Sequence, residues 1–128
     1  MLPKITLLAL LLLPLSAQAV EYQCKVEKKF DSVREYTSEQ IVREQYSVQI
    51  KEENGETLVS RCSFVESAQK VTCDEYQIDK VVQDPNVKIK KYYLFKSQFD
   101  VQLFPSMFFV ENNGRGGIAY GKCKIVAP

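Results

Sequence analysis

The sequence predicts an all-β fold, a small antiparallel meander of about seven or eight strands that closes as a barrel or a sandwich. Three observations predict it. Short stretches of alternating apolar and polar residues recur along the chain, as they do in half-buried strands. Asn, Asp, Gly and Pro gather between these stretches, where tight turns need them. The chain also has four cysteines, an even number that indicates two disulfides in an exported small domain.

The first residues, 1–19, are typical of a secretory signal peptide. Lys4 supplies a positive charge, a leucine-rich apolar run covers 5–15, and Ala17-Gln18-Ala19 places small residues at the two positions that signal peptidase reads. The apolar run is shorter than the ~20 residues needed to cross a bilayer. We therefore expect cleavage after this segment and export to a bacterial periplasm or the extracellular medium. The remaining chain, 20–128, is predicted to form a single β domain.

The first half of this domain alternates clearly. Period-two patterns predict one strand around 22–27 and another around 46–51. Asn54-Gly55 follows the second pattern and favours a tight hairpin turn, because both residues tolerate a positive φ. The chain then returns as a strand over 57–65. A further strand is predicted over 71–82, where the alternation slips and indicates a bulge.

The segment that precedes the second strand is ambiguous. Thr37 with Gln40, or Ser38 as the N-cap, would open a short helix near 38–44. Alternatively, Ile41 would begin a long curled strand that ends at Glu53. We favour a short helix or a loop in this segment.

The second half is predicted from turns and short alternations. Asp84-Pro85-Asn86 is typical of a turn, and 112–117 is a second one. Two irregularities are expected within the strands, the bulge at Asp74-Glu75 and a phase break at Lys90-Lys91. The remaining predicted strands cover 87–95, 99–103, 107–111 and 118–126.

The predicted disulfides are Cys62–Cys73 and Cys24–Cys123. A turn centred near Ser67 places Cys62 opposite Cys73 in an antiparallel pair, close enough for a disulfide. Cys24 belongs to the first strand and Cys123 to the last, so a bridge between them ties the two ends of the domain. In the loop-entropy model such a long loop contributes ~4–5 kcal/mol. A zinc site is a poor alternative, because the cysteines lack paired short spacings and no histidine is present.

The composition argues against an enzyme. Histidine is absent, which removes the usual general base and the commonest metal ligand. Oxidised cysteines provide no thiolate nucleophile, and no nucleophile elbow, phosphate loop or calcium loop occurs. We therefore predict no catalytic residue, no metal and no cofactor.

The net charge of the chain indicates which classes of binding partner to expect. The chain has 17 Lys and Arg against 16 Asp and Glu, and loss of Lys4 with the signal peptide would leave it neutral. A neutral chain lacks the cationic excess that nucleic acids and anionic membrane surfaces attract. We expect a protein partner, no nucleic acid and no membrane span. The oligomeric state is left open.

One candidate for partner binding is the predicted turn after the strand over 107–111. Asn and Gly in such a turn can serve backbone geometry alone. Arg115, however, has glycines near it that let the backbone approach a partner closely. An arginine at a loop tip can enter an acidic cleft and form a bidentate ion pair with a carboxylate. The candidate residues are Asn112, Asn113, Gly114, Arg115 and Gly116.

The second candidate is an apolar patch or cavity. The stretches 92–95 and 103–110 carry more apolar bulk than one face of a strand can bury. A strand pair covered on both faces explains this bulk. An exposed anchor for a protein partner and the mouth of an apolar ligand cavity are the alternatives. Because Pro105 has no N–H, the chain should bend there or lie at a sheet edge. The candidate residues are Tyr92, Tyr93, Phe104, Met107, Phe108 and Phe109.

Tyr22-Gln23-Cys24 at the start and Cys123 near the end are loosely similar to periplasmic lysozyme inhibitors. The Ser-Gly loop of the membrane-bound lysozyme inhibitor family is missing, so we assign the chain to no family. The resemblance implies an exported binding protein, an inhibitor or immunity-type protein for an envelope hydrolase such as lysozyme. Such inhibitors need a cationic group, because enzymes that cleave carbohydrates use paired carboxylates. The alternatives are a β-barrel carrier of an apolar ligand or lipid, and a structural subunit of an envelope assembly.

Overall fold

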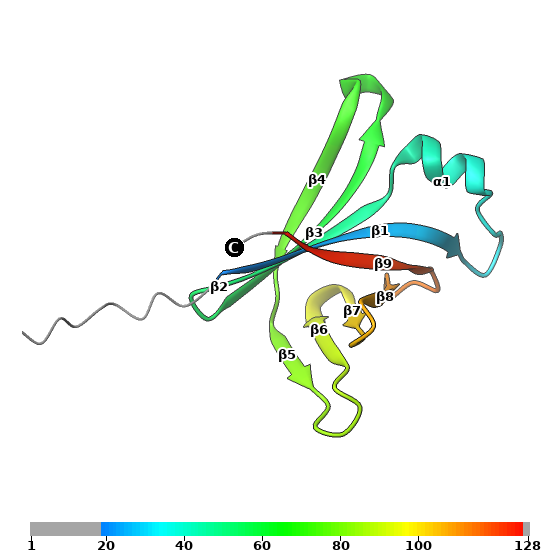
Figure 1. The fold of residues 1–128 in the computed structure, drawn as a ribbon. Coiled ribbons are helices and arrows are strands. Elements are labelled where there is room, and N and C mark those ends of the chain that lie inside the picture. Colours follow the sequence, from blue (N-terminus) through cyan, green and yellow to red (C-terminus); the bar gives the residue numbers. More distant parts are fainter. Residues whose placement is uncertain (1–18, 127–128) are drawn as a thin grey trace, which may run out of the picture.

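A computed structural model describes residues 19–126, so the predicted signal peptide lies outside the described residues except for Ala19. Within 19–126 the chain forms nine strands and one α-helix (Figure 1). The strands are β1 (Val20–Phe30), β2 (Ser47–Glu53), β3 (Glu56–Val65), β4 (Lys70–Gln77), β5 (Lys80–Gln83), β6 (Lys90–Leu94), β7 (Phe99–Leu103), β8 (Phe108–Asn112) and β9 (Ile118–Val126). No helix in this part of the chain has the length and apolar character needed to cross a membrane.

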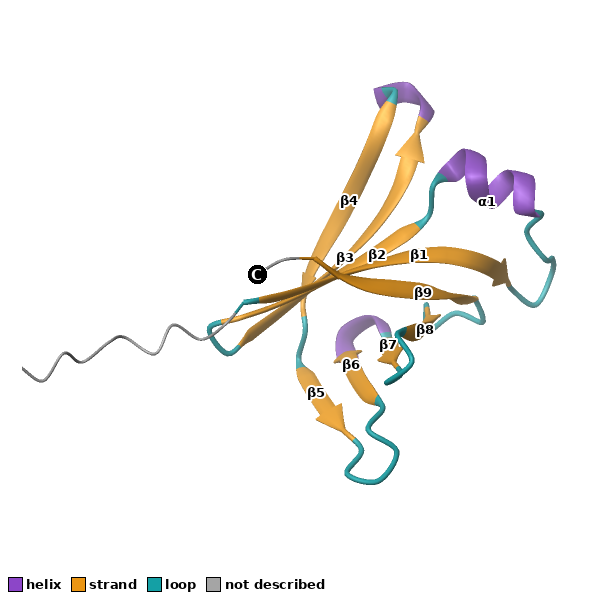
Figure 2. Ribbon diagram, viewed as in Figure 1, coloured by secondary structure: helices purple, strands orange, loops and turns teal. Residues whose placement is uncertain are grey.

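All nine described strands belong to one antiparallel sheet with the order β4-β3-β2-β1-β9-β8-β7-β6-β5. The first and last strands, β1 and β9, pair at its centre. The sheet curls into a half-barrel, and its two wings bend toward each other (Figure 2). The predicted all-β meander is confirmed. Because one continuous sheet forms, the half-barrel decides against the sandwich alternative.

The two ends of the sheet are joined by a bend between β4 and β5. The amide of Ile78 donates to the carbonyl of Thr57 on the β3 side, at 2.9 Å. The next amide, that of Asp79, donates to the carbonyl of Tyr93 in β6, also at 2.9 Å. One bent strand therefore pairs first with β3 and then with β6. This change of partner makes nine strands where about seven or eight were expected.

The two irregularities predicted from the sequence are wrong. The β3–β4 ladder runs without a shift through Asp74-Glu75. The alternation slips there because apolar residues occupy both faces of a regular strand, Val71 and Cys73 on one and Tyr76 and Ile78 on the other. The ladder of β6 is also regular through Lys90-Lys91, since that strand begins at Lys90. The residues before it form the predicted turn, in which Asp84 Oδ1 accepts hydrogen bonds from the next amides. A register shift does occur in β1, between Val26 and Lys28.

The ambiguous segment contains a helix, α1 (Ser38–Glu44), as favoured from the sequence. Thr37 is its N-cap and accepts a hydrogen bond from the amide of Gln40 at 3.1 Å. The amide of Thr37 in turn donates to Gln40 Oε1 at 2.9 Å, which completes a capping box. Ile41 points into the core. The helix ends at Gln45, which adopts a left-handed conformation.

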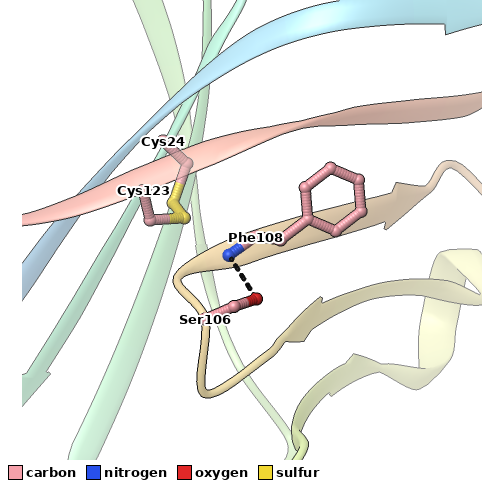
Figure 3. The surroundings of a disulfide bond; sticks show 4 residues. All are labelled: Cys24, Ser106, Phe108 and Cys123. Atoms are coloured by element: carbon pink, nitrogen blue, oxygen red, sulfur yellow. Dashed lines mark hydrogen bonds between the residues drawn. A yellow bond between two sulfur atoms is a disulfide. The ribbon is translucent and has the colours of Figure 1, made fainter.

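Both predicted disulfides are present, and the described residues contain no free cysteine. Cys62 faces Cys73 across the β3–β4 hairpin, in the predicted register. Cys24 and Cys123 join β1 to β9 near the β7–β8 turn, where the amide of Phe108 donates to Ser106 Oγ (Figure 3). The Cys24–Cys123 bridge links the two ends of the domain across a sequence separation of 99. Both disulfides are consistent with an oxidising compartment.

The core fills the concave side of the half-barrel. Alternate residues of each strand point inward, as the period of two requires. Phe109 in β8 lies directly over Gly121 in β9, where an added Cβ would collide with the Phe109 ring. Seven side chains are essentially removed from solvent, namely Cys24, Val48, Ile50, Val59, Tyr92, Val101 and Phe109.

Candidate functional site

The topology brings four connections to one end of the half-barrel. In an antiparallel meander alternate connections lie at the same end, and the bent β4–β5 strand counts as one passage. The end in question carries the connections β1–β2, β3–β4, β6–β7 and β8–β9. We call it the loop end. Its β6–β7 connection is a short 3-10 turn, η2 (Phe95–Ser97). Its β8–β9 connection is the Gly-rich turn, which was predicted over 112–117 and covers 113–117, because Asn112 belongs to β8.

The Gly-rich turn is held by its own side chains. Asn113 Oδ1 accepts hydrogen bonds from the amides of Arg115, at 2.7 Å, and Gly117, at 2.9 Å. Asn112 Oδ1 accepts from the amide of Gly114 at 2.9 Å. The two asparagines predicted as binding candidates therefore fix the backbone of the turn. The Arg115 side chain is left exposed at its tip.

This turn also packs against η2. Gly114 has a φ of 77°, and an added Cβ there would collide with the carbonyl oxygens of Ser97 and Gln98. Gly116 also has a positive φ, 90°, but it faces open space. A glycine is thus required at 114 both for its backbone angle and for the close approach. The contact places Arg115 and Lys96 on two adjoining turns.

Between these turns and the opposite wing lies a cavity of about 520 Å³, which we call the basic cavity. It has three cationic side chains and no carboxylate among its lining residues. Tyr76 from β4 and Phe99 from β7 meet there with ring centroids 6.3 Å apart. The lining residues are Arg61, Tyr76, Leu94, Lys96, Ser97, Phe99, Asn113 and Arg115.

Arg61 is held by an ion pair that crosses the concave face. Its Nε and Nη2 donate to Glu111 Oε1 at 2.9 and 2.7 Å. Arg61 lies in β3 and Glu111 in β8, and three strands separate these two in the sheet, so the contact exists only because the sheet curls. The Glu111 side chain is 7% exposed and the Arg61 side chain 35%. A carboxylate buried to this extent needs a cationic or hydrogen-bonding partner.

A smaller cavity of about 170 Å³ adjoins the same arginine. Its lining mixes charges, because it includes Lys29 and Arg61 together with Asp74 and Glu111. Lys29 Nζ lies 4.0 Å from the centroid of the Tyr46 ring, a cation–π distance. Burial raises the pKa of the Tyr46 hydroxyl. In this smaller cavity the positive and negative side chains balance. The basic cavity, which is lined by cations without a carboxylate, is therefore better suited to an anion.

The six apolar candidates do not gather into one site. Tyr92 and Phe109 are fully buried in the core. Tyr93 stacks on Phe95 near the loop end, with ring centroids 6.1 Å apart. Phe104 lies against Phe108 at 5.9 Å, and Phe108 points away from the core because its neighbour Phe109 points into it. Met107 packs against the core from the β7–β8 turn.

Sequence reasoning missed Arg61 and Lys96, and it placed Glu111 at the end of the strand over 107–111 without giving it a role. The alternation of inward and outward residues along the strands could have identified Arg61 and Glu111. Val59 and Phe109 are inward positions, so Arg61 and Glu111, two residues further along, are inward as well. A cation and an anion at core positions of two strands predict a buried pair. Lys96 carries no such signal, because its position depends on how two separate turns pack.

Pro105 bends the chain, as predicted, but not at a sheet edge. It lies in the turn between β7 and β8, whereas the edge strands are β4 and β5. Within residues 19–126 no group of three or more His, Cys, Asp or Glu side chains is placed to hold a metal ion.

The chain matches no protein-family model, no curated protein and no solved structure.

Proposed function

We propose that this chain is an exported binding protein that inhibits a hydrolase of the cell envelope, with Arg115 as the residue that enters the enzyme. The observation that carries the proposal is the exposed Arg115 side chain on a turn whose backbone is already fixed. Asn113 holds that turn from within, and Gly114 docks it on η2. A loop ordered before binding loses less conformational entropy on association.

The chemistry of Arg115 suits an acidic cleft. A guanidinium offers two parallel N–H donors to a carboxylate, and enzymes that cleave glycosidic bonds use a pair of carboxylates. Lys96 and Arg61 lie around the same cavity and add to the positive potential. Positive potential at a docking surface speeds the encounter with an acidic partner. These features support lysozyme-type glycosidases as partners.

The proposed location is the periplasm or the extracellular medium. The two disulfides are consistent with such a compartment, and the pattern of residues 1–19 predicts an export signal. An inhibitor that works there meets envelope hydrolases directly.

The test is a lysis assay with purified lysozymes of several structural types, each with and without the mature protein. We expect protection against at least one type and loss of that protection in Arg115→Ala. Lys124→Ala is the matched control, because it removes an exposed cation from β9 on the face away from the core. Protection from none of the enzymes, or equal protection by all three proteins, would remove the proposal.

No specific observation in the structure favours the apolar carrier or the structural subunit. An apolar carrier needs aromatic side chains around an empty interior, whereas Tyr92 and Phe109 fill the core. A structural subunit would pair with its neighbours through an exposed sheet edge, whereas Pro105, where the sequence allowed such an edge, lies in a turn. The inhibitor remains the proposal of choice.

A further inference from the structure

We propose that the basic cavity is a binding site for a small organic anion in which a carboxylate or phosphate is attached to a flat ring. This proposal goes beyond the inhibitor proposal and does not rest on it, but the two share Arg115. The cavity of about 520 Å³ lies within the ~300–1,000 Å³ typical of small-molecule sites. Three cationic side chains line it without a carboxylate, although the whole chain carries nearly equal numbers of both charges.

Arg61 provides the fixed anchor for the anion. Its two bonds to Glu111 use only Nε and one donor of Nη2, so three of the five guanidinium N–H groups remain for a ligand. Glu111 holds the arginine in place and offsets one positive charge. With Glu111 counted, the cavity still carries a surplus of two positive charges from Lys96 and Arg115.

The other two cations sit on turns that the fold holds in position. Gly114 packs the Arg115 turn on η2, which carries Lys96. The η2 turn is in turn tied to the β4–β5 bend, because the amide of Phe95 donates to Asp79 Oδ2 at 2.8 Å. Cations from three separate elements thus converge on one space. Such convergence suits an anion with several acceptor oxygens.

The walls of the cavity favour a ring. Tyr76 is half-buried and lines the cavity, with the buried Phe99 beside it at a ring-centroid distance of 6.3 Å and an interplanar angle of 38°. Leu94 adds an aliphatic side. A flat ring packed there would gain aromatic contact, while its acidic group reaches the cations. A ringless anion such as inorganic phosphate would leave the aromatic wall in water.

The test is isothermal titration calorimetry of the mature, disulfide-bonded protein at low salt with four probes. These probes are phenyl phosphate, benzoate, inorganic phosphate and phenol. We expect saturable one-to-one binding of phenyl phosphate and of benzoate. Inorganic phosphate should bind about tenfold more weakly because it forgoes the ring contact, and phenol should not bind measurably.

Variants locate the site. Lys96→Ala and Arg115→Ala remove exposed side chains, so the fold should persist, as near-UV circular dichroism would verify. Each variant should bind phenyl phosphate with about tenfold lower affinity, because each loses one charge-assisted hydrogen bond to the ligand. Lys124→Ala should leave the affinity within about twofold, because it removes a cation on the far face.

Three results would overturn the proposal: no saturable binding of phenyl phosphate or benzoate up to about 10 mM, equal affinity for phosphate with and without a ring, or equal affinity in all three variants. The titration contains no enzyme, so its failure is separate from failure of the lysis assay. If both succeed, phenyl phosphate should compete with the inhibited enzyme, because Arg115 serves both.

Discussion

Tyr92 is the most deeply placed polar side chain of the core. Its hydroxyl donates to Glu52 Oε1 at 2.6 Å, and Lys90 Nζ reaches the same oxygen at 2.7 Å. Tyr92 and Lys90 lie in β6 and Glu52 in β2, so this cluster spans the concave face as Arg61–Glu111 does. Burial, and then the bond to Glu52, raise the pKa of the Tyr92 hydroxyl far above its ordinary value of 10.0.

This raised pKa predicts a loss of stability in alkali. The folded protein keeps Tyr92 protonated, so its contribution is complete below the unfolded pKa and falls as pH rises beyond it. We expect the free energy of unfolding to fall by about 1 kcal/mol more between pH 10 and 11 in wild type than in Tyr92→Phe. Urea unfolding of wild type and Tyr92→Phe at the two pH values measures this difference. Equal slopes in wild type and Tyr92→Phe would refute the assignment.

The Arg61–Glu111 pair makes a different prediction. Arg61→Met leaves the Glu111 carboxylate buried without its cation and should cost about 2–3 kcal/mol, less than for a fully buried pair because Arg61 is a third exposed. Adding Glu111→Leu should restore most of that loss, because two apolar side chains need no partner. Chemical denaturation of the single and double variants checks this. A double variant no more stable than Arg61→Met would show that the pair does not act as a unit.

Among the elements, the Gly-rich turn has the sharpest sequence requirement. Gly114→Ala forces an alanine to a φ of 77° and a Cβ against the backbone of η2. We expect it to lose about 2 kcal/mol of stability and to disturb Arg115. Gly116→Ala, at a φ of 90° in open space, should lose about 1 kcal/mol or less. Thermal unfolding of the two variants tests the difference, and equal losses would mean that the turn does not dock on η2.

The individual elements also show which features of the fold a local sequence pattern can predict. Thr37 and Gln40 predict the capping box, and Asn54-Gly55 predicts the hairpin, because these preferences are set within a few residues. The bend at Ile78 and Asp79 escaped prediction. Its cause is that consecutive amides find acceptors in strands far apart in the sequence. The slip near Asp74-Glu75 has a different cause: apolar residues occupy both faces of a regular strand, and the pattern alone assigned this to a bulge.

At the scale of the whole molecule, the sheet keeps its curl through ties between distant segments. Cys24–Cys123 joins the terminal strands, and the Arg61–Glu111 and Glu52–Lys90 pairs cross the concave face. Both disulfides could be predicted, one from hairpin register and one from its position at the chain ends. The basic cavity could not, because Lys96, Arg61 and Arg115 meet only after the sheet has curled.

Removal of each disulfide should show which of the two contributes more to the free energy of unfolding. Replacing Cys24 and Cys123 by Ser opens a loop with a sequence separation of 99 and should cost about 4–5 kcal/mol. Replacing Cys62 and Cys73 opens one with a separation of 11 and should cost about 3 kcal/mol. Equilibrium unfolding in urea compares the two double variants. A larger loss from the short loop would mean that loop entropy does not dominate.

We propose above that the loop end, through Arg115, captures an acidic group of a partner. The most direct measurement is the ratio of inhibition constants of Arg115→Ala and wild type, taken against the most strongly inhibited lysozyme at about 50 and 500 mM salt. We expect a ratio of about thirty or more at low salt and a smaller ratio at high salt, because salt screens the charge–charge attraction. A ratio near one at both salt concentrations would contradict it.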